Sequence, residues 1–246
     1  MFYLYGINVM EGGGGGGEQE PGYEVSKHKF IAFLENEAKI RVDDFIEGAI
    51  DIAEEVHSGV KREDRLSPFL ETHTLPVTMD VVKHYRSVNR NITSVEIASS
   101  ILHDVLEDND RILDWYQTKA YGFEAYLVYR FGNRVYHIAT ELKIRPLENY
   151  SGTDYEERQL ARFQDYCNML ISADYDVKVI KLADRLNNMR FISRVSEHPK
   201  VERYLREAED FFLAYTMLEP KMPDFYKKIR LAYEKLRELS EKVLAT

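Results

Sequence analysis

The spacing of apolar residues is helical along almost the whole chain, and this spacing constrains the fold more than any other feature. Between residues 42 and 56, apolar side chains recur every three or four positions, as in a helix with one buried face. The same spacing predicts helices over 75–88, 93–108, 123–131, 134–143, 154–172, 177–192, 200–218 and 224–244. No stretch of useful length alternates apolar and polar residues. We therefore predict an all-α fold, a compact bundle of many helices.

The N-terminal segment differs from the remainder because Gly12–Gly17 is a run of six glycines. A phosphate-binding glycine loop would need a preceding strand and a following Lys-Ser/Thr pair, and the sequence has neither. We predict that residues 1–24 form a flexible tail. Residues 25–195 are predicted to form the main domain, with C-terminal helices over 196–246 packed on that domain.

Charge and cysteine content exclude several kinds of protein. The chain has 33 Lys+Arg against 42 Asp+Glu, a net charge of −9, which disfavours a general nucleic-acid binder. No apolar run is long enough for a membrane span, and Met1–Met10 lacks the basic start of a signal peptide. Cys167 is the single cysteine, so no internal disulfide forms, which fits a reducing compartment. We expect a cytoplasmic protein without nucleic-acid or membrane partners.

Aromatic residues near the C-terminus motivate the hypothesis of a homo-oligomer. They are Phe211, Phe212, Tyr215, Tyr226 and Tyr233. Aromatic side chains of this kind are common in protein interfaces.

The segment SSILHDVLED, residues 99–108, gathers one imidazole and three carboxylates. On a continuous helix, residues four apart share a face, so we expect His103 above Glu107 and Asp104 above Asp108. Three neighbouring acids repel one another unless a cation or a basic group balances them. A divalent metal is the natural balance, and adjacent nitrogen and oxygen ligands suit Mn²⁺, Fe²⁺ or Zn²⁺.

A second segment, VKVIKLADRLNNMR over 177–190, places an acid among apolar residues. Asp184 and Asn188 are four apart on one helical face, and Lys181 and Arg185 are four apart on a neighbouring face. An aspartate in apolar surroundings is unfavourable unless it is paired. Metal ligation would satisfy Asp184, and so would a salt bridge to Arg185 or a helix cap.

A third segment, HSGVKREDRLSPFLETH over 57–73, holds two histidines and three basic residues. The three segments together resemble the hydrolase domain of the RelA/SpoT family, within the HD superfamily of metal-dependent phosphohydrolases. The His-Asp-x-x-Glu-Asp run at 103–108 and the KLADRL-x-NMR run at 181–190 carry most of the resemblance. Phe131-Gly132 and the His57-x-Gly59 stretch that leads to His73 resemble further family elements.

The resemblance implies an all-α HD fold and a site for a divalent metal, usually Mn²⁺ although another divalent metal would also suit it. Four residues fall on the family's metal ligands: His73, His103, Asp104 and Asp184. Glu107 and Asp108 fall on the acidic pair that handles the attacking water and the proton transfer.

The resemblance also implies residues that bind the substrate. Asn188 falls on a contact to the ribose, and Arg62 falls on a basic residue that faces the purine base. Lys143 and Lys181 are candidates for binding phosphate charge. Glu63 stands where the family usually has lysine, and the loop from Arg62 to His73 is longer than the family pattern, so the choice between guanine and adenine stays open.

The implied function is that of a stand-alone alarmone hydrolase, which removes the 3′-pyrophosphate of a nucleotide such as ppGpp. We expect no synthetase domain, because few residues follow Arg190. Two alternatives stay open. One is an HD phosphatase or phosphodiesterase that acts on another nucleotide, such as NADPH. The other is a nucleotide-binding regulator without catalytic activity.

Overall fold

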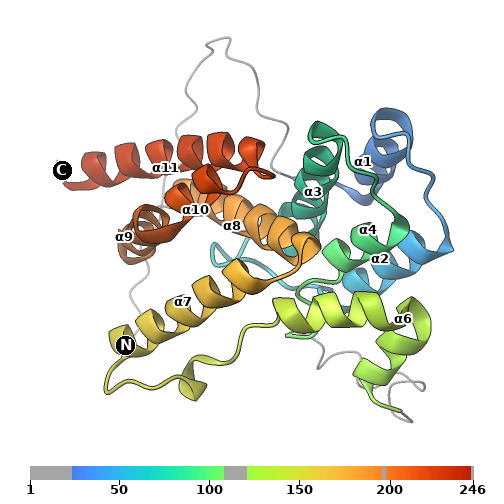
Figure 1. Cartoon of the computed structure of the whole chain (residues 1–246), viewed down its shortest axis with the longest axis horizontal. Helices are drawn as coiled ribbons and strands as arrows, with labels where there is room; N and C mark the ends of the chain where they lie inside the picture. Colours follow the sequence, from blue (N-terminus) through green and yellow to red (C-terminus); the bar gives the residue numbers. More distant parts are fainter. Residues whose placement is uncertain (1–23, 108–120, 196–197, 245–246) are drawn as a thin grey trace.

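The computed structural model describes residues 24–107, 121–195 and 198–244, and most of these residues are helical (Figure 1). Their only β-type pairing is an isolated bridge between Lys61 and Pro68. The α-helices are α1 (Lys27–Ala32), α2 (Asp44–Val56), α3 (Leu75–Ser87), α4 (Ser94–Ile101), α6 (Phe123–Leu142), α7 (Tyr155–Ser172), α8 (Tyr175–Val195), α9 (His198–Glu207), α10 (Leu213–Leu218) and α11 (Pro223–Leu244). Three π-helical turns (Phe33–Glu37, Leu70–Thr74 and Ala208–Phe212) and one 3₁₀ turn (Leu147–Asn149) lie between them. The all-α prediction is confirmed, and the predicted tail lies outside the described residues except for Glu24.

Side-chain caps and one glycine define several helix boundaries that the sequence predicted. The Asp43 carboxylate accepts hydrogen bonds from the backbone N–H groups at the start of α2. Thr93 and Glu96 form a capping box at the start of α4, where the sequence predicted that a helix begins. Gly132 adopts φ +80°, a value that L-residues rarely take, and it divides α6 at the predicted point.

The predicted helix over 93–108 is wrong in its second half, because α4 ends at Ile101. The chain then continues in tighter turns, in which the backbone N–H of Glu107 donates to the carbonyl of Asp104 at 3.0 Å. The ring of His103 lies 2.7 Å from the Ser100 carbonyl, one of the groups that a helix end leaves without a backbone partner. Asp104 and Glu107 are therefore related by a turn, and the predicted helical stacking of His103 on Glu107 does not occur.

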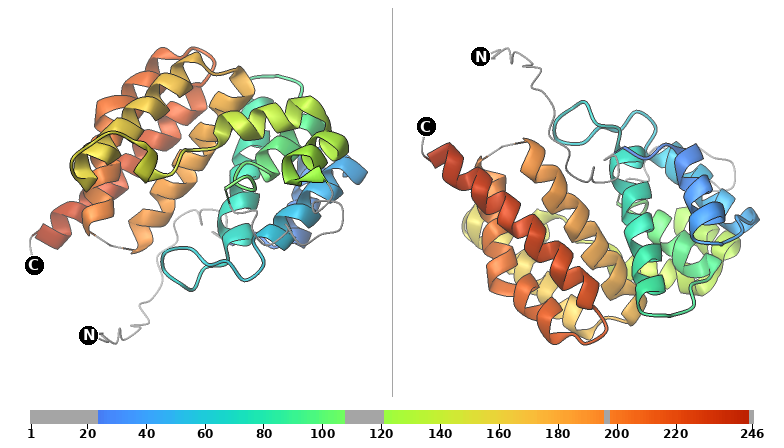
Figure 2. Two further views of the ribbon diagram at one scale, coloured as in Figure 1. Left: turned by 90° about the horizontal axis from the view of Figure 1, so that it is seen from below. Right: turned by 90° about the horizontal axis from the view of Figure 1, so that it is seen from above.

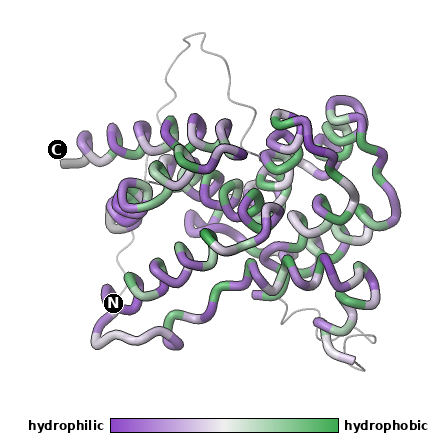
Figure 3. Tube along the Cα trace, in the orientation of Figure 1, coloured by the Kyte–Doolittle hydropathy of each residue, from purple (hydrophilic) through white to green (hydrophobic). Residues whose placement is uncertain are grey.

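Two groups of helices lie on either side of α3 (Figure 2), and each group has its own hydrophobic core. The first core is formed by α1, α2, α4 and much of α6, and the second mainly by α8 and the C-terminal helices. Leu75 and Val82 of α3 belong to the first core, whereas Val81 and Tyr85 belong to the second. Polar and apolar residues are interspersed along each helix, as one-sided burial requires (Figure 3). Helix α3 therefore joins the two halves.

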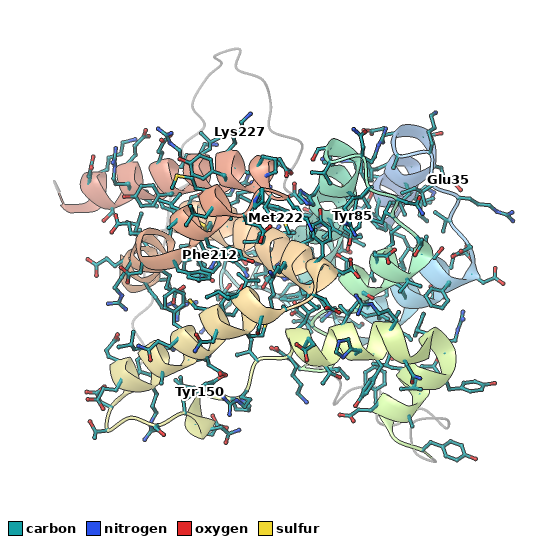
Figure 4. The ribbon with its side chains drawn as sticks, viewed as in Figure 1. Glu35, Tyr85, Tyr150, Phe212, Met222 and Lys227 are labelled. Atoms are coloured by element: carbon teal, nitrogen blue, oxygen red, sulfur yellow. The ribbon has the colours of Figure 1, made fainter. Side chains whose placement is uncertain are left out.

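The C-terminal helices pack on the second half, where Phe212 and Met222 are labelled in Figure 4. Phe212 is fully buried, and the ring of Phe211 stacks on Tyr215 with centroids 5.0 Å apart. These aromatic side chains therefore pack against other residues of the same chain. The homo-oligomer stays a prediction. Among the described helices, none combines the length and the apolar content that crossing a bilayer requires.

A polar network joins α3, α8 and α11 beside the second core. His84 is fully buried, and its ring nitrogens contact Asp224 Oδ1 at 2.5 Å and the Tyr175 hydroxyl at 2.8 Å. Lys228 Nζ lies 3.3 Å from Asp224 Oδ2. Burial alone would raise the pKa of Asp224, but the hydrogen bond and charge of His84 and the charge of Lys228 hold that pKa below its usual value.

We expect Asp224→Asn to lower the free energy of unfolding by about 1.5–3 kcal/mol at pH 7, the range for a hydrogen bond to a charged group. A carboxyl with a depressed folded-state pKa stabilises the fold above its unfolded pKa of about 3.9, and this contribution is lost as pH falls through the folded-state pKa. Urea unfolding at pH 7 and pH 3 should therefore show a smaller difference between variant and wild type in acid. An equal difference at both pH values would contradict this role of Asp224.

Candidate metal centre

Two imidazoles and two carboxylates from three separate elements converge between the two cores. His73 comes from the π-helical turn before α3, His103 and Asp104 from the turns after α4, and Asp184 from α8. His73 Nε2 lies 3.2 Å from His103 Nε2, 3.1 Å from Asp104 Oδ2 and 3.5 Å from Asp184 Oδ1. His103 Nε2 lies 3.0 Å from Asp104 Oδ2. The structure thus brings together all four predicted ligands.

The spacing of these atoms fits a single divalent cation. Two ligand atoms that each lie about 2.1 Å from a metal, at angles between octahedral and tetrahedral, are about 3.0–3.4 Å apart. Three of the four separations, at 3.0, 3.1 and 3.2 Å, lie in this range, and the fourth, between His73 Nε2 and Asp184 Oδ1, is 3.5 Å. His73, His103 and Asp184 each offer a ligand atom within 4.8 Å of the others. A mixed set of imidazole and carboxylate ligands suits Mn²⁺, Fe²⁺ or Zn²⁺.

Hydrogen bonds on the far side of each imidazole fix which nitrogen faces the centre. His73 Nδ1 lies 2.9 Å from Asn187 Oδ1, and His103 Nδ1 lies 2.7 Å from the Ser100 carbonyl. Both partners are oxygen acceptors, so each Nδ1 carries the hydrogen. The Nε2 lone pairs of both rings are then available to a metal.

The charges of the cluster shift its protonation equilibria. Burial alone would lower the pKa of His103, but the charge and hydrogen bond of Asp104 raise it above its usual value. Burial likewise opposes ionisation of Asp104, yet the two imidazoles hold its pKa well below the usual range. Partial desolvation in the cleft and the negative charge of Asp104 raise the pKa of Glu107. The cluster therefore favours a positive charge at its centre.

The surroundings of Asp184 distinguish between the partners that its sequence context left open. Its carboxylate faces His73, accepts a hydrogen bond from Asn188 Nδ2 at 2.6 Å, and lies 3.8 Å from Lys181 Nζ. The predicted alternative of an ion pair with Arg185 is wrong, because Arg185 pairs with Glu207.

Arg62 is buried next to the candidate metal centre, with only 6% of its surface exposed. Its guanidinium donates to Asn187 Oδ1, to Asn188 Oδ1 and to the Thr72 carbonyl at 2.7, 2.6 and 3.1 Å. The group also stacks on Phe191 at 3.7 Å. The predicted contacts of Arg62 with the base and of Asn188 with the ribose stay predictions. Sequence reasoning missed Asn187, whose only signal was its place beside Asn188 in the KLADRL-x-NMR run.

Two cavities, of about 680 and 700 Å³, meet at the candidate centre. Glu107, Ile144, Asp184 and Asn188 line both of them. The carboxylate of Glu107 is held by the backbone N–H of Ile144, which donates to Oε1 at 2.8 Å. Lys143 lines the first cavity, and Lys181 lines the second. Asp108 lies outside the described residues, so its predicted role stays a prediction.

Comparison with known proteins agrees with this geometry. Residues 49–214, about two thirds of the chain, match the HD domain family. The chain belongs to the HD domain family. HD domains bind divalent metals, and the His/Asp cluster of this chain is a candidate site for one.

Curated relatives support the RelA/SpoT resemblance. The chain is 29% identical over 158 residues to the putative chloroplastic GTP diphosphokinase RSH1 of Oryza sativa subsp. japonica. It is 28% identical over 172 residues to a GTP pyrophosphokinase of Myxococcus xanthus. These matches cover 63% and 69% of this chain but only 16% and 20% of the relatives. The protein is thus RelA/SpoT-like, and family and site together support a metal-dependent phosphohydrolase.

Proposed function

We propose that this HD domain hydrolyses the 3′-pyrophosphate of a guanosine or adenosine alarmone such as ppGpp, with Mn²⁺ as the metal. The observation that carries the proposal is the convergence of His73, His103, Asp104 and Asp184 where two cavities meet. The likeness to a GTP diphosphokinase and a GTP pyrophosphokinase supports a guanine nucleotide pyrophosphate as substrate.

The reaction requires water to attack the phosphorus that is bonded to the ribose 3′ oxygen. The bond between that phosphorus and the 3′ oxygen breaks, pyrophosphate leaves, and the 3′ oxygen gains a proton. A bound divalent cation lowers the pKa of a coordinated water towards ~7 and draws charge from a phosphate oxygen. Glu107, anchored at the cleft by Ile144, accepts the proton of the attacking water. Asp108 is the predicted proton donor to the 3′ oxygen.

The cleft has the charge that a substrate with several phosphates requires. Although the chain carries a net charge of −9, cations line both cavities. In the first cavity they are Lys143, Arg145, Arg162, Arg185 and Arg203, and in the second Lys61, Arg62, Arg65, Lys181 and Lys200. The buried Nε of Arg203 has no hydrogen-bond partner within the described part of the chain, and it lies 3.9 Å from Glu207 Oε1. Arg185, Arg145 and Lys200 already pair with Glu207, Asp165 and Glu63. Phosphate groups would therefore interact chiefly with other cations of the cleft, such as Lys143 and Arg162.

Substitution of Arg162 or Lys143 tests whether the first cavity binds phosphate. Arg162 hydrogen-bonds to the neutral Gln159, so its charge is not balanced by that partner. We expect Arg162→Ala or Lys143→Ala to lower kcat/KM for ppGpp about 10–100-fold, because a charge-assisted hydrogen bond contributes about 1.5–3 kcal/mol. Arg130→Ala is the control, since Arg130 lines a separate surface pocket. Unchanged kcat/KM in both cavity variants would contradict the phosphate assignment.

Product analysis tests the proposed function itself. Purified protein is incubated with Mn²⁺ and ppGpp, ppApp or NADPH, with a chelator control, and the products are separated by ion-exchange chromatography. Metal-dependent release of pyrophosphate from ppGpp or ppApp supports the proposal. Release of orthophosphate alone identifies a phosphatase acting on another bond, and bound Mn²⁺ without turnover of any nucleotide identifies a regulator. Either of the last two results overturns the proposal.

A further inference from the structure

One buried guanidinium is connected to two candidate metal ligands through two consecutive amides. Arg62 Nη1 donates to Asn187 Oδ1 at 2.7 Å, and Nη2 donates to Asn188 Oδ1 at 2.6 Å. Asn187 and Asn188 are neighbours on α8, and the planar fork of an arginine presents two parallel donors at a suitable spacing.

Each of these amides makes a second hydrogen bond, and this bond is to a ligand. Asn187 Oδ1 accepts from His73 Nδ1 at 2.9 Å. Asn188 Nδ2 donates to Asp184 Oδ1 at 2.6 Å. Arg62 is thereby linked to His73 in the turn before α3 and to Asp184 in α8, two candidate ligands that come from different elements.

The orientation of both amides follows from the chemistry of arginine. A guanidinium only donates hydrogen bonds, so both Oδ1 atoms must face Arg62. The NH₂ group of Asn188 then necessarily faces Asp184. The Oδ1 of Asn187 necessarily receives the hydrogen of His73 Nδ1, which leaves Nε2 of His73 unprotonated for a metal.

Arg62 is itself held in place, as an orienting group must be. The Thr72 carbonyl accepts from Nη1 at 3.1 Å, and the Phe191 ring lies 3.7 Å from the guanidinium carbon. Thr72 is the residue before His73, so Arg62 also fixes the backbone next to that ligand.

We propose that Arg62 is a positioning residue for the metal centre, which orients His73 through Asn187 and Asp184 through Asn188. This inference rests on the metal site of the proposed function and gives Arg62 a role beyond the predicted purine contact. Partners that orient metal ligands typically contribute 10–100-fold to metal affinity.

Titration of the metal-free protein with Mn²⁺ alone, followed by calorimetry or by the EPR signal of free Mn²⁺, tests the inference without any nucleotide. We expect Arg62→Lys to weaken Mn²⁺ binding about 10–100-fold, because one ammonium cannot hold both amides. Arg90→Lys is the control, since the Arg90 guanidinium also stacks on an aromatic ring, that of Tyr175, but is exposed and has no described contact with the ligands. Thermal unfolding of the metal-free variants checks that they are folded.

Two variants of Asn187 keep the test valid if Arg62→Lys fails to fold. Asn187→Leu removes the acceptor and is expected to weaken Mn²⁺ binding about 10–100-fold. Asn187→Asp retains an acceptor for both Arg62 and His73, loses only the Nδ2 hydrogen bond to the Thr72 carbonyl at 3.3 Å, and should stay within about threefold of wild type. If wild type binds Mn²⁺ and Arg62→Lys or Asn187→Leu binds it equally well, the inference fails while the proposed function stands. If wild type binds Mn²⁺ but hydrolyses no alarmone, the proposed function fails and the loss of affinity in the variants still supports the inference.

Discussion

Asp184→Asn is expected to lower turnover of an alarmone at least ~10³-fold while leaving the protein folded. The substitution keeps the size of the side chain but removes the negative charge that faces His73 at 3.5 Å. A bound metal contributes several kcal/mol to stabilising the transition state, and each 1.36 kcal/mol is a factor of ten in rate. Steady-state rates at saturating Mn²⁺, together with circular dichroism, measure the effect.

Asp174→Asn is the matched control for this prediction. Asp174 is an exposed aspartate that pairs with Arg134 on the surface and lines neither cavity of the cleft. Its variant should keep turnover within about twofold of wild type, since exposed ion pairs contribute little. An Asp184→Asn variant that retained more than a tenth of wild-type turnover would show that Asp184 does not hold the metal.

Glu107→Gln is expected to lower kcat about 10²–10⁴-fold, the usual contribution of a general base, with Mn²⁺ affinity within about threefold of wild type. Glutamine keeps an oxygen that can accept the hydrogen bond from Ile144, which now lies at 2.8 Å, but it cannot take a proton from water. The separation of kcat from metal binding distinguishes Glu107 from the ligands. Stopped assays with Mn²⁺ titration of the same preparation provide both values.

Glu148→Gln provides the comparison, because Glu148 is an exposed glutamate in the 3₁₀ turn after α6. It should have wild-type turnover. Turnover of Glu107→Gln within tenfold of wild type would assign the proton transfer to another group. A large loss of Mn²⁺ affinity in Glu107→Gln would instead make Glu107 part of the metal centre.

The local parts of this fold could be predicted from sequence because they depend on neighbouring residues. The capping box of Thr93 and Glu96 and the kink at Gly132 each follow from a few adjacent positions. The end of α4 could not be predicted in this way. It coincides with the contact of the His103 ring with the Ser100 carbonyl, and the same ring lies 3.2 Å from His73, which comes from another element.

The candidate site was predictable in part from the residues themselves, because the acids and the adjacent His103 and Asp104 already indicated a divalent metal. The resemblance added His73 and selected metal ligation for Asp184, which helical spacing alone would have left with Arg185 as an equally good partner. Asn187 could not be found, because its contact with Arg62 joins residues 125 positions apart. Such pairings depend on how the loop before α3 packs against α8, and no local pattern encodes that packing.

Anomalous diffraction from crystals grown with Mn²⁺ tests the central claim most directly. The account predicts one anomalous peak, bonded at about 2.0–2.3 Å to Nε2 of His73 and His103 and to carboxylate oxygens of Asp104 and Asp184. No peak between these four side chains at saturating Mn²⁺, or a peak bound only elsewhere on the protein, would contradict it.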